Sequence, residues 1–119
     1  MISGGLISED TRFLFGGYGR FDILAASVVK QMKETTPGIE LVLVLPYLNK
    51  EIDSELYDST VYPPLESVPP RYAIVHRNRW MVDNSDLVVA YVTHGWGGEA
   101  STLKYAERKK KRVILYPNI

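Results

Sequence analysis

Residues 13–22, Phe-Leu-Phe-Gly-Gly-Tyr-Gly-Arg-Phe-Asp, constrain the fold more than any other stretch of the chain. Three apolar residues run directly into glycines, and the apolar spacing of a helix follows at Leu24, Val28 and Met32. This pattern predicts a buried strand that turns abruptly into a helix, with Asp22 as the N-cap of that helix. Glycines in such a turn let a ligand approach the backbone, and the amides at a helix start attract anions. The alternative is a tight turn that binds nothing.

A second turn of the same kind occurs at residues 95–98, Gly-Trp-Gly-Gly. An apolar run at 87–92 precedes this turn, and a helical pattern follows it. Two similar turns in one small domain favour a ligand over an accidental cluster of glycines.

Strands and helices alternate along the whole chain. We expect strands at 12–15, 40–45, 86–92 and 113–116, and helices at about 22–35, 71–84 and 99–111. The run at 39–45 is almost continuously apolar, which is typical of a strand with both faces covered. We therefore predict an α/β fold of the Rossmann-like, three-layer α/β/α type, with a mostly parallel sheet of about four strands in the order 2-1-3-4. The first and third strands would be neighbours, and both glycine turns would lie at the carboxyl edge, where ligands bind.

Composition excludes several classes of function. The 119 residues suffice for a single domain, 1–119, and contain no cysteine, so disulfides, thiolate catalysis and cysteine-bound zinc are excluded. His76 and His94 lack the spacing of a metal site, and we expect no metal or cofactor. The 14 basic and 14 acidic residues cancel, so no overall field favours nucleic acid or membrane. No signal peptide or membrane-spanning run occurs in the sequence, so we expect a cytoplasmic protein.

Two further stretches each allow two interpretations. Residues 49–70 lack clear periodicity and contain two Pro-Pro pairs, which indicates either a lid or binding loop or a surface excursion whose tyrosines cover the edge of the core. The candidate contacts of this loop are Tyr57, Tyr62 and Glu66. The basic run at 108–112 resembles a nucleic-acid patch, but cations at a helix C-terminus also complement the helix dipole. We favour the second explanation and expect no nucleic-acid partner.

Four motifs occur together and in order, at residues 15–22, 45–48, 77–86 and 102–106. As a set they resemble the YpsA-like family of unknown function, DUF1273, found in bacteria and phages and part of the SLOG superfamily. The resemblance covers residues 12–116. It implies a Rossmann-like fold with a nucleotide-derived ligand at the glycine turns. Both enzymes and ligand sensors belong to this superfamily.

The N-terminal region differs from that of the family. Members usually begin with a further strand and helix before the first glycine motif, whereas only a short segment precedes Arg12 here. Residues 6–10 resemble the tail of that helix, so we expect 1–11 to be an arm or a remnant. A chain without the leading strand has fewer elements to cover its apolar strands, and we therefore expect a symmetric homodimer.

The catalytic motifs of the superfamily are incomplete. Its phosphoribohydrolases carry Gly-Gly-x-Gly-Thr-x-x-Glu, and an overlay on residues 16–19 places Arg20 at the threonine, with Asp22 as the carboxylate nearest the glutamate. Residues 84–106 also resemble nucleoside 2-deoxyribosyltransferases, whose nucleophilic glutamate aligns with Thr102. That chemistry requires a carboxylate at the anomeric carbon, and only Glu99 or Asp22 could replace it. We expect hydrolase activity to be weak or absent.

Three functions remain open at this stage. The first is a module that senses or sequesters a nucleotide-derived small molecule. The second is a hydrolase or transferase of N-glycosidic bonds, with Glu99 and Asp22 as candidate catalytic residues. The third is a protein-interaction module with an empty pocket. The expected ligand contacts are Gly16, Gly17, Tyr18, Gly19, Arg20, Asp22, Pro46, Arg77, Asn78, His94, Trp96, Gly97, Gly98 and Glu99.

Several of these residues have a specific expected role. Arg20 would pair with phosphate through its planar guanidinium, or else lie in solvent. Asn78 would bond a glycine turn or the ligand. Trp96 would stack on a base or cover the sheet edge. His94 would act as a general acid or phosphate ligand, or serve only as a polar loop residue.

Overall fold

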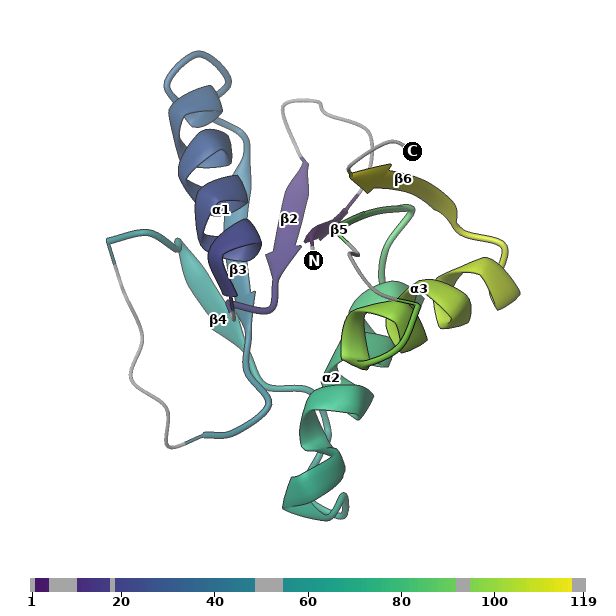
Figure 1. The fold of residues 1–119 in the computed structure, drawn as a ribbon. Helices are drawn as coiled ribbons and strands as arrows, with labels where there is room; N and C mark the ends of the chain where they lie inside the picture. The colour runs from purple at the N-terminus through teal and green to yellow at the C-terminus, as the bar shows by residue number, and fades with distance from the viewer. Residues whose placement is uncertain (1, 5–10, 18, 49–54, 92–94, 117–119) are drawn as a thin grey trace.

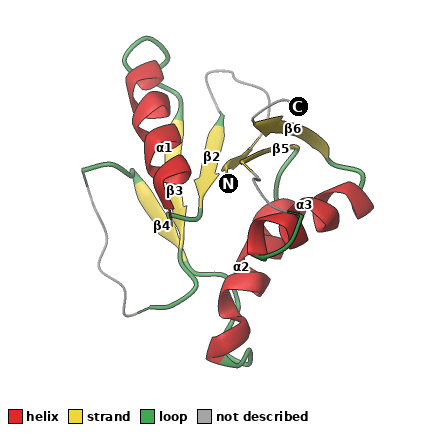
Figure 2. Cartoon of the chain, viewed as in Figure 1, coloured by secondary structure: helices red, strands yellow, loops and turns green. Residues whose placement is uncertain are grey.

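The computed structural model describes residues 2–4, 11–17, 19–48, 55–91 and 95–116. After the first two strands, helices and strands alternate except at one further pair of consecutive strands (Figures 1 and 2). The elements in chain order are β1 (Ile2–Gly4), β2 (Arg12–Phe15), α1 (Gly19–Lys33), β3 (Glu40–Val44), β4 (Ser59–Val61), a 3₁₀ turn (Pro70–Tyr72), α2 (Ala73–Asp83), β5 (Leu87–Tyr91), α3 (Gly98–Arg108) and β6 (Arg112–Tyr116).

One sheet contains all the described strands, in the order β4-β3-β2-β1-β5-β6. β1 runs antiparallel to both β2 and β5, and the remaining pairs are parallel. The predicted α/β class is confirmed. The predicted strands also keep their relative order, because β3, β2, β5 and β6 follow one another across the sheet.

The central part of the predicted sheet is wrong in two respects. β1 lies between β2 and β5, so the first and third predicted strands are not neighbours, and the sheet has six strands rather than about four. Ile2 pairs with Phe15 on one side and with Val89 on the other. Residues 2–4 are therefore a strand and not part of an arm. The expected helical remnant at 6–10 lies outside the described residues.

Helices lie on both faces of the sheet. Alternate residues of β3 enter different hydrophobic clusters, because successive side chains of a strand point to opposite faces. Leu41 and Leu43 pack in one cluster with Val29 of α1, whereas Val42 and Val44 pack in another. The second cluster contains Met81 and Val82 of α2 and Ala106 of α3. The continuous apolar run of this strand therefore indicated its burial correctly.

α1 begins three residues earlier than the sequence predicted. Gly19 is its first residue, so Asp22 lies within the first turn and is not the N-cap. The Asp22 side chain is 4% exposed, and its Oδ2 lies 3.2 Å from the position that a Cβ on Gly16 would occupy. A carboxylate in the first turn still lies at the positive end of the helix dipole. Its burial shows that it faces the protein rather than solvent.

The predicted loop at 49–70 contains a strand, β4, which pairs parallel with β3 at the edge of the sheet. Its three residues were too few for a periodic pattern, and an edge position tolerates neighbouring prolines. Tyr57 is 8% exposed and its ring centroid lies 5.8 Å from that of Phe15. Tyr57 is therefore a core residue, as the surface-excursion interpretation required, and not a contact of a binding loop.

The face of the sheet that α1 covers is less buried towards β5 and β6. Tyr91 is 39% exposed and Ile114 is 53% exposed. Both belong to the face that carries Val89, because paired parallel residues share a face. Apolar surface of this kind is consistent with self-association, and the homodimer stays a prediction. In the described part of the chain, no helix combines the length and the apolar character that a membrane crossing requires.

Candidate functional site

The first glycine turn is packed against side chains of the protein itself. A Cβ on Gly16 would lie 3.2 Å from the Arg77 guanidinium and 3.2 Å from the Asp22 carboxylate. Gly17 has φ +77°, where only glycine is unstrained, and its Cβ would lie 2.5 Å from Leu43 Cδ1. The glycines of this turn therefore leave room for neighbouring side chains, which fill the space that a ligand would need.

Arg77 connects this turn to the sheet. Its side chain is 3% exposed, and Nη1 donates hydrogen bonds to the carbonyl oxygens of Gly16 at 2.8 Å and Val44 at 2.9 Å. Nε donates to Oδ1 of Asn78 at 2.8 Å. One residue of α2 thus bonds to the backbone just beyond the end of β2 and at the last residue of β3. In this structure Arg77 contacts the protein itself, and the ligand contact expected at Arg77 stays a prediction.

Asn78 continues the same network to the second glycine turn. Its Nδ2 donates to Thr102 Oγ1 at 3.3 Å, and the Thr102 hydroxyl donates to the Gly98 carbonyl at 2.8 Å. Asn78 thus contacts a glycine turn indirectly, through Thr102. Among the described residues, no buried side-chain nitrogen or oxygen lacks a hydrogen-bond partner. The protein itself therefore satisfies this buried network, which links both turns.

The two turns lie at one edge of the sheet. Phe21, in the first turn of α1, stacks on Tyr91, the last residue of β5, with ring centroids 5.4 Å apart and an angle of 8° between the planes. β2 and β5 run in the same direction, because both are antiparallel to β1. Their carboxyl ends therefore meet at one edge, as predicted.

The second glycine turn is open. Apart from the chain neighbours of each glycine and the backbone of α3, no atom of the described residues lies within 4 Å of the position that a Cβ would occupy on Gly95, Gly97 or Gly98. Gly97 is the N-cap of α3, with φ +93° and no side-chain cap on the free amides of the helix start. Trp96 is 74% exposed. This turn therefore has the space for a ligand that the first turn lacks.

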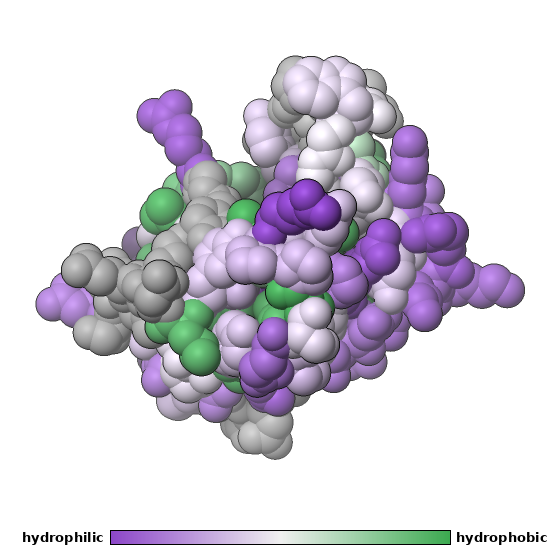
Figure 3. Space-filling model, turned by 90° about the horizontal axis from the view of Figure 1, so that it is seen from below, coloured by the Kyte–Doolittle hydropathy of each residue, from purple (hydrophilic) through white to green (hydrophobic). Residues whose placement is uncertain are grey.

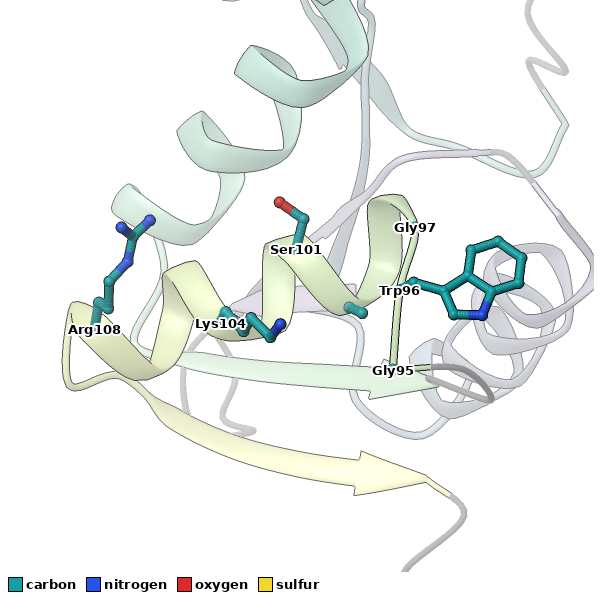
Figure 4. Close-up of a pocket in the computed structure, with 7 residues that line it drawn as sticks. Gly95, Trp96, Gly97, Ser101, Lys104 and Arg108 are labelled. Atoms are coloured by element: carbon teal, nitrogen blue, oxygen red, sulfur yellow. The ribbon is translucent and has the colours of Figure 1, made fainter.

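A hollow of about 450 Å³ extends from this turn along the outer surface of α3 (Figure 4). The Trp96 indole lies at one end and Arg108 at the other, with Ser101 and Lys104 between them. We call it the α3 hollow; its lining residues are Gly95, Trp96, Gly97, Ala100, Ser101, Lys104 and Arg108. An aromatic surface, helix amides, a hydroxyl and two cations are the groups that bind an aromatic ring joined to anions.

The C-terminal end of α3 is strongly basic. Tyr105 donates its hydroxyl to both carboxylate oxygens of Asp83, at 2.8 and 2.9 Å. Burial and this hydrogen bond raise the pKa of Tyr105, so the phenol stays neutral. Arg79, Arg108 and Lys109 lie over its ring, with charged atoms 5.3, 5.6 and 5.5 Å from the centroid. In Figure 3 hydrophilic residues gather on the right, the side on which α3 ends in Figure 1.

A second hollow, of about 330 Å³, lies beyond the ends of β3 and β4. Pro46, Tyr62 and Glu66 line it together with Tyr47, whose hydroxyl donates to the Pro70 carbonyl at 2.9 Å. Two of the three loop residues named from the sequence therefore line a hollow. It lies beside the start of α2, and the described residues of its lining include no glycine turn and no cation.

The remaining predicted site residues are divided between the two turns. Arg20 is exposed on the first turn of α1, and Glu99 is exposed on the first turn of α3. Glu99 does not line the α3 hollow. Gly19 is the first residue of α1. Tyr18 and His94 lie outside the described residues.

Sequence reasoning missed the three polar or charged residues of α3 that line the hollow, Ser101, Lys104 and Arg108. Their spacing was a usable signal. Residues three, four and seven positions apart share one face of a helix, and these three follow Gly97 at such intervals. Lys104 lies in the motif at 102–106, which served only to identify the resemblance. Arg108 lies in the basic run at 108–112, which was explained by the helix dipole.

The position aligned with the transferase nucleophile holds no carboxylate. Thr102 is 6% exposed, and its hydroxyl lies in the network between Asn78 and Gly98. Asp22 is packed against the first turn, whereas Glu99 belongs to the helix that follows the second. No carboxylate lines the α3 hollow in the described part of the chain. This geometry offers no group to trap an oxocarbenium-like centre there.

Within the described ranges, no group of three or more His, Asp or Glu side chains is arranged to hold a metal ion. No protein-family model matches the chain, and no curated protein matches it significantly.

Proposed function

We propose that this chain binds a nucleotide-derived small molecule in the α3 hollow, as a sensor or sequestering module. The observation that carries the proposal is the contrast at the second glycine turn. Its glycines have open space around them, and the hollow that begins there is lined by an exposed tryptophan and two cations.

The base and the phosphate of a nucleotide each have a matching group in the α3 hollow. The Trp96 ring offers a flat surface on which a base stacks. The uncapped amides at the start of α3 and the Ser101 hydroxyl offer donors to a phosphate. Gly97 and Gly98 allow that phosphate to approach the backbone closely, because they carry no Cβ.

An enzyme of N-glycosidic bonds is the less favoured alternative. It needs a carboxylate beside the bound sugar, and the described residues that line the hollow include none. Glu99 and Glu107 are the acidic residues next in sequence to that lining, and both are exposed. The binding function requires no such group.

The test is a thermal-shift and calorimetric titration with AMP and GMP, comparing the natural chain with Trp96→Ala. Loss of base stacking should cost about 1–3 kcal/mol of binding free energy, or roughly tenfold in affinity or more. Tyr72→Ala is the matched control, because it removes an exposed aromatic residue that does not line the hollow. Failure of every nucleotide to bind, or equal affinity in Trp96→Ala, would refute the proposal.

A further inference from the structure

The α3 hollow is longer than a nucleoside monophosphate needs. Gly97, Ser101, Lys104 and Arg108 are three or four residues apart and so lie on one stripe of the helix. Lys104 is about 10 Å along the helix axis from Gly97, and Arg108 about 16 Å, from the rise of 1.5 Å per residue. A phosphate held at the helix start would not reach either position.

The two cations are placed to meet further negative charge. Side chains on a helix tilt towards its N-terminus, so Lys104 leans back towards Ser101 and the start of α3. Both Lys104 and Arg108 are exposed, and in Figure 4 they follow one another along the helix away from Trp96. With a base on Trp96 and a first phosphate at Gly97, a second phosphate would lie next to Lys104.

We infer that the ligand of the α3 hollow is a nucleotide with two or more linked phosphates, and that Lys104 and Arg108 select for the second and third phosphate. This inference rests on the proposed function. Ser101 lies on the helix between Gly97 and Lys104 and also lines the hollow. A nucleoside diphosphate and a dinucleotide share the pyrophosphate group that this stripe recognises.

The experiment compares AMP, ADP and ATP by calorimetry at low salt, without divalent cations, because these would neutralise the phosphates. ADP should bind about tenfold more tightly than AMP, since a hydrogen bond to a charged group contributes on that scale. Lys104→Ala should remove this gain, so that ADP binds this variant no more tightly than AMP does. Arg108→Ala should remove only the further gain of ATP over ADP.

Lys109→Ala is the matched control. Lys109 is the neighbour of Arg108 and is equally exposed, but it does not line the hollow. Its loss changes the net charge by the same amount, so ADP and ATP should keep their advantage in this variant. Lys104→Arg, which keeps the charge, should retain most of the gain.

Three outcomes would overturn the inference. The first is equal affinity for AMP, ADP and ATP, which leaves the proposed function intact. The second is an equal loss in Lys104→Ala and Lys109→Ala, which indicates a diffuse charge effect. The third is a single-stranded oligonucleotide that binds more tightly than ATP and depends on Lys109. Absence of all nucleotide binding would instead refute the proposed function itself.

Discussion

The two glycine turns look alike in sequence and lie at the same edge of the sheet, yet their surroundings differ. Around Gly16 and Gly17 the protein supplies Arg77, Asp22 and Leu43 within 3.2 Å of where a Cβ would be. Around Gly97 and Gly98 the described residues supply no atom within 4 Å. A glycine can thus make room for the protein's own side chains or for something outside it. Only the second kind of space is available to a ligand.

This difference changes which turn is the better site. The sequence placed an anion at both turns together, with the first as the main element. In the structure the Arg77 guanidinium already occupies the first turn, where it donates to Gly16 and Val44. The guanidinium donates hydrogen bonds to backbone carbonyl oxygens that would bond to water in an open turn.

The comparison can be tested first by removing the side chain of Arg77, which fills the first glycine turn. Arg77→Ala leaves the buried carbonyl oxygens of Gly16 and Val44 without their charged donor. We expect a loss of about 3–6 kcal/mol in the free energy of unfolding, at 1.5–3 kcal/mol for each hydrogen bond to a charged group. Urea denaturation measures it. Arg79→Ala, which removes an exposed arginine of the same helix, should cost less than about 1 kcal/mol. Similar losses in the two variants would show that Arg77 does not organise the first turn.

A smaller effect is expected from adding one methyl group to each turn. Gly17→Ala combines a positive φ with a contact of 2.5 Å to Leu43, so we expect a loss of about 2–5 kcal/mol in stability. Gly97→Ala has only the positive φ and should lose about 1–2 kcal/mol. Thermal unfolding of the two variants gives the comparison directly. An equal loss would mean that the second turn is packed as tightly as the first.

The smallest effect on stability should come from Gly98→Ala. Gly98 opens α3, its added Cβ meets no described atom, and alanine favours a helix, so the change should be within about 1 kcal/mol and stabilising in sign. Its effect on binding should be larger, because the Cβ occupies the space where a phosphate approaches the amides. We expect AMP affinity to fall about tenfold, the value of one charged hydrogen bond. Unchanged binding would place the ligand elsewhere.

These experiments also bear on a variant that the glycine motif alone would suggest. The glycine motif alone predicts that Gly17→Val blocks a ligand at the first turn and leaves the fold intact. The contact with Leu43 and the positive φ mean that it would destabilise the fold instead. Loss of ligand binding in that variant would therefore not identify a site. Gly98→Ala avoids this ambiguity, because its added methyl group meets open space.

The sequence by itself predicted the local elements well. Apolar periodicity located α1, α2, α3 and the strands β2, β3, β5 and β6 to within a few residues, because period and burial are properties of neighbouring residues. The continuous apolar run at 39–45 correctly predicted a strand covered on both faces. The alternation of elements also predicted that both turns lie at one edge of the sheet.

The tertiary structure decided what the local pattern does not contain. β1 pairs through only three residues, too few for a periodic signal, with β2, which is 9–13 residues away, and with β5, which is 83–87 residues away. The side chains that fill the first glycine turn come from α1, β3 and α2, and β3 and α2 are distant from that turn in sequence. Whether a glycine faces a neighbour or solvent is a question of packing, and packing depends on the whole chain. For that reason the sequence identified two equivalent turns, and only the fold made one of them a candidate site.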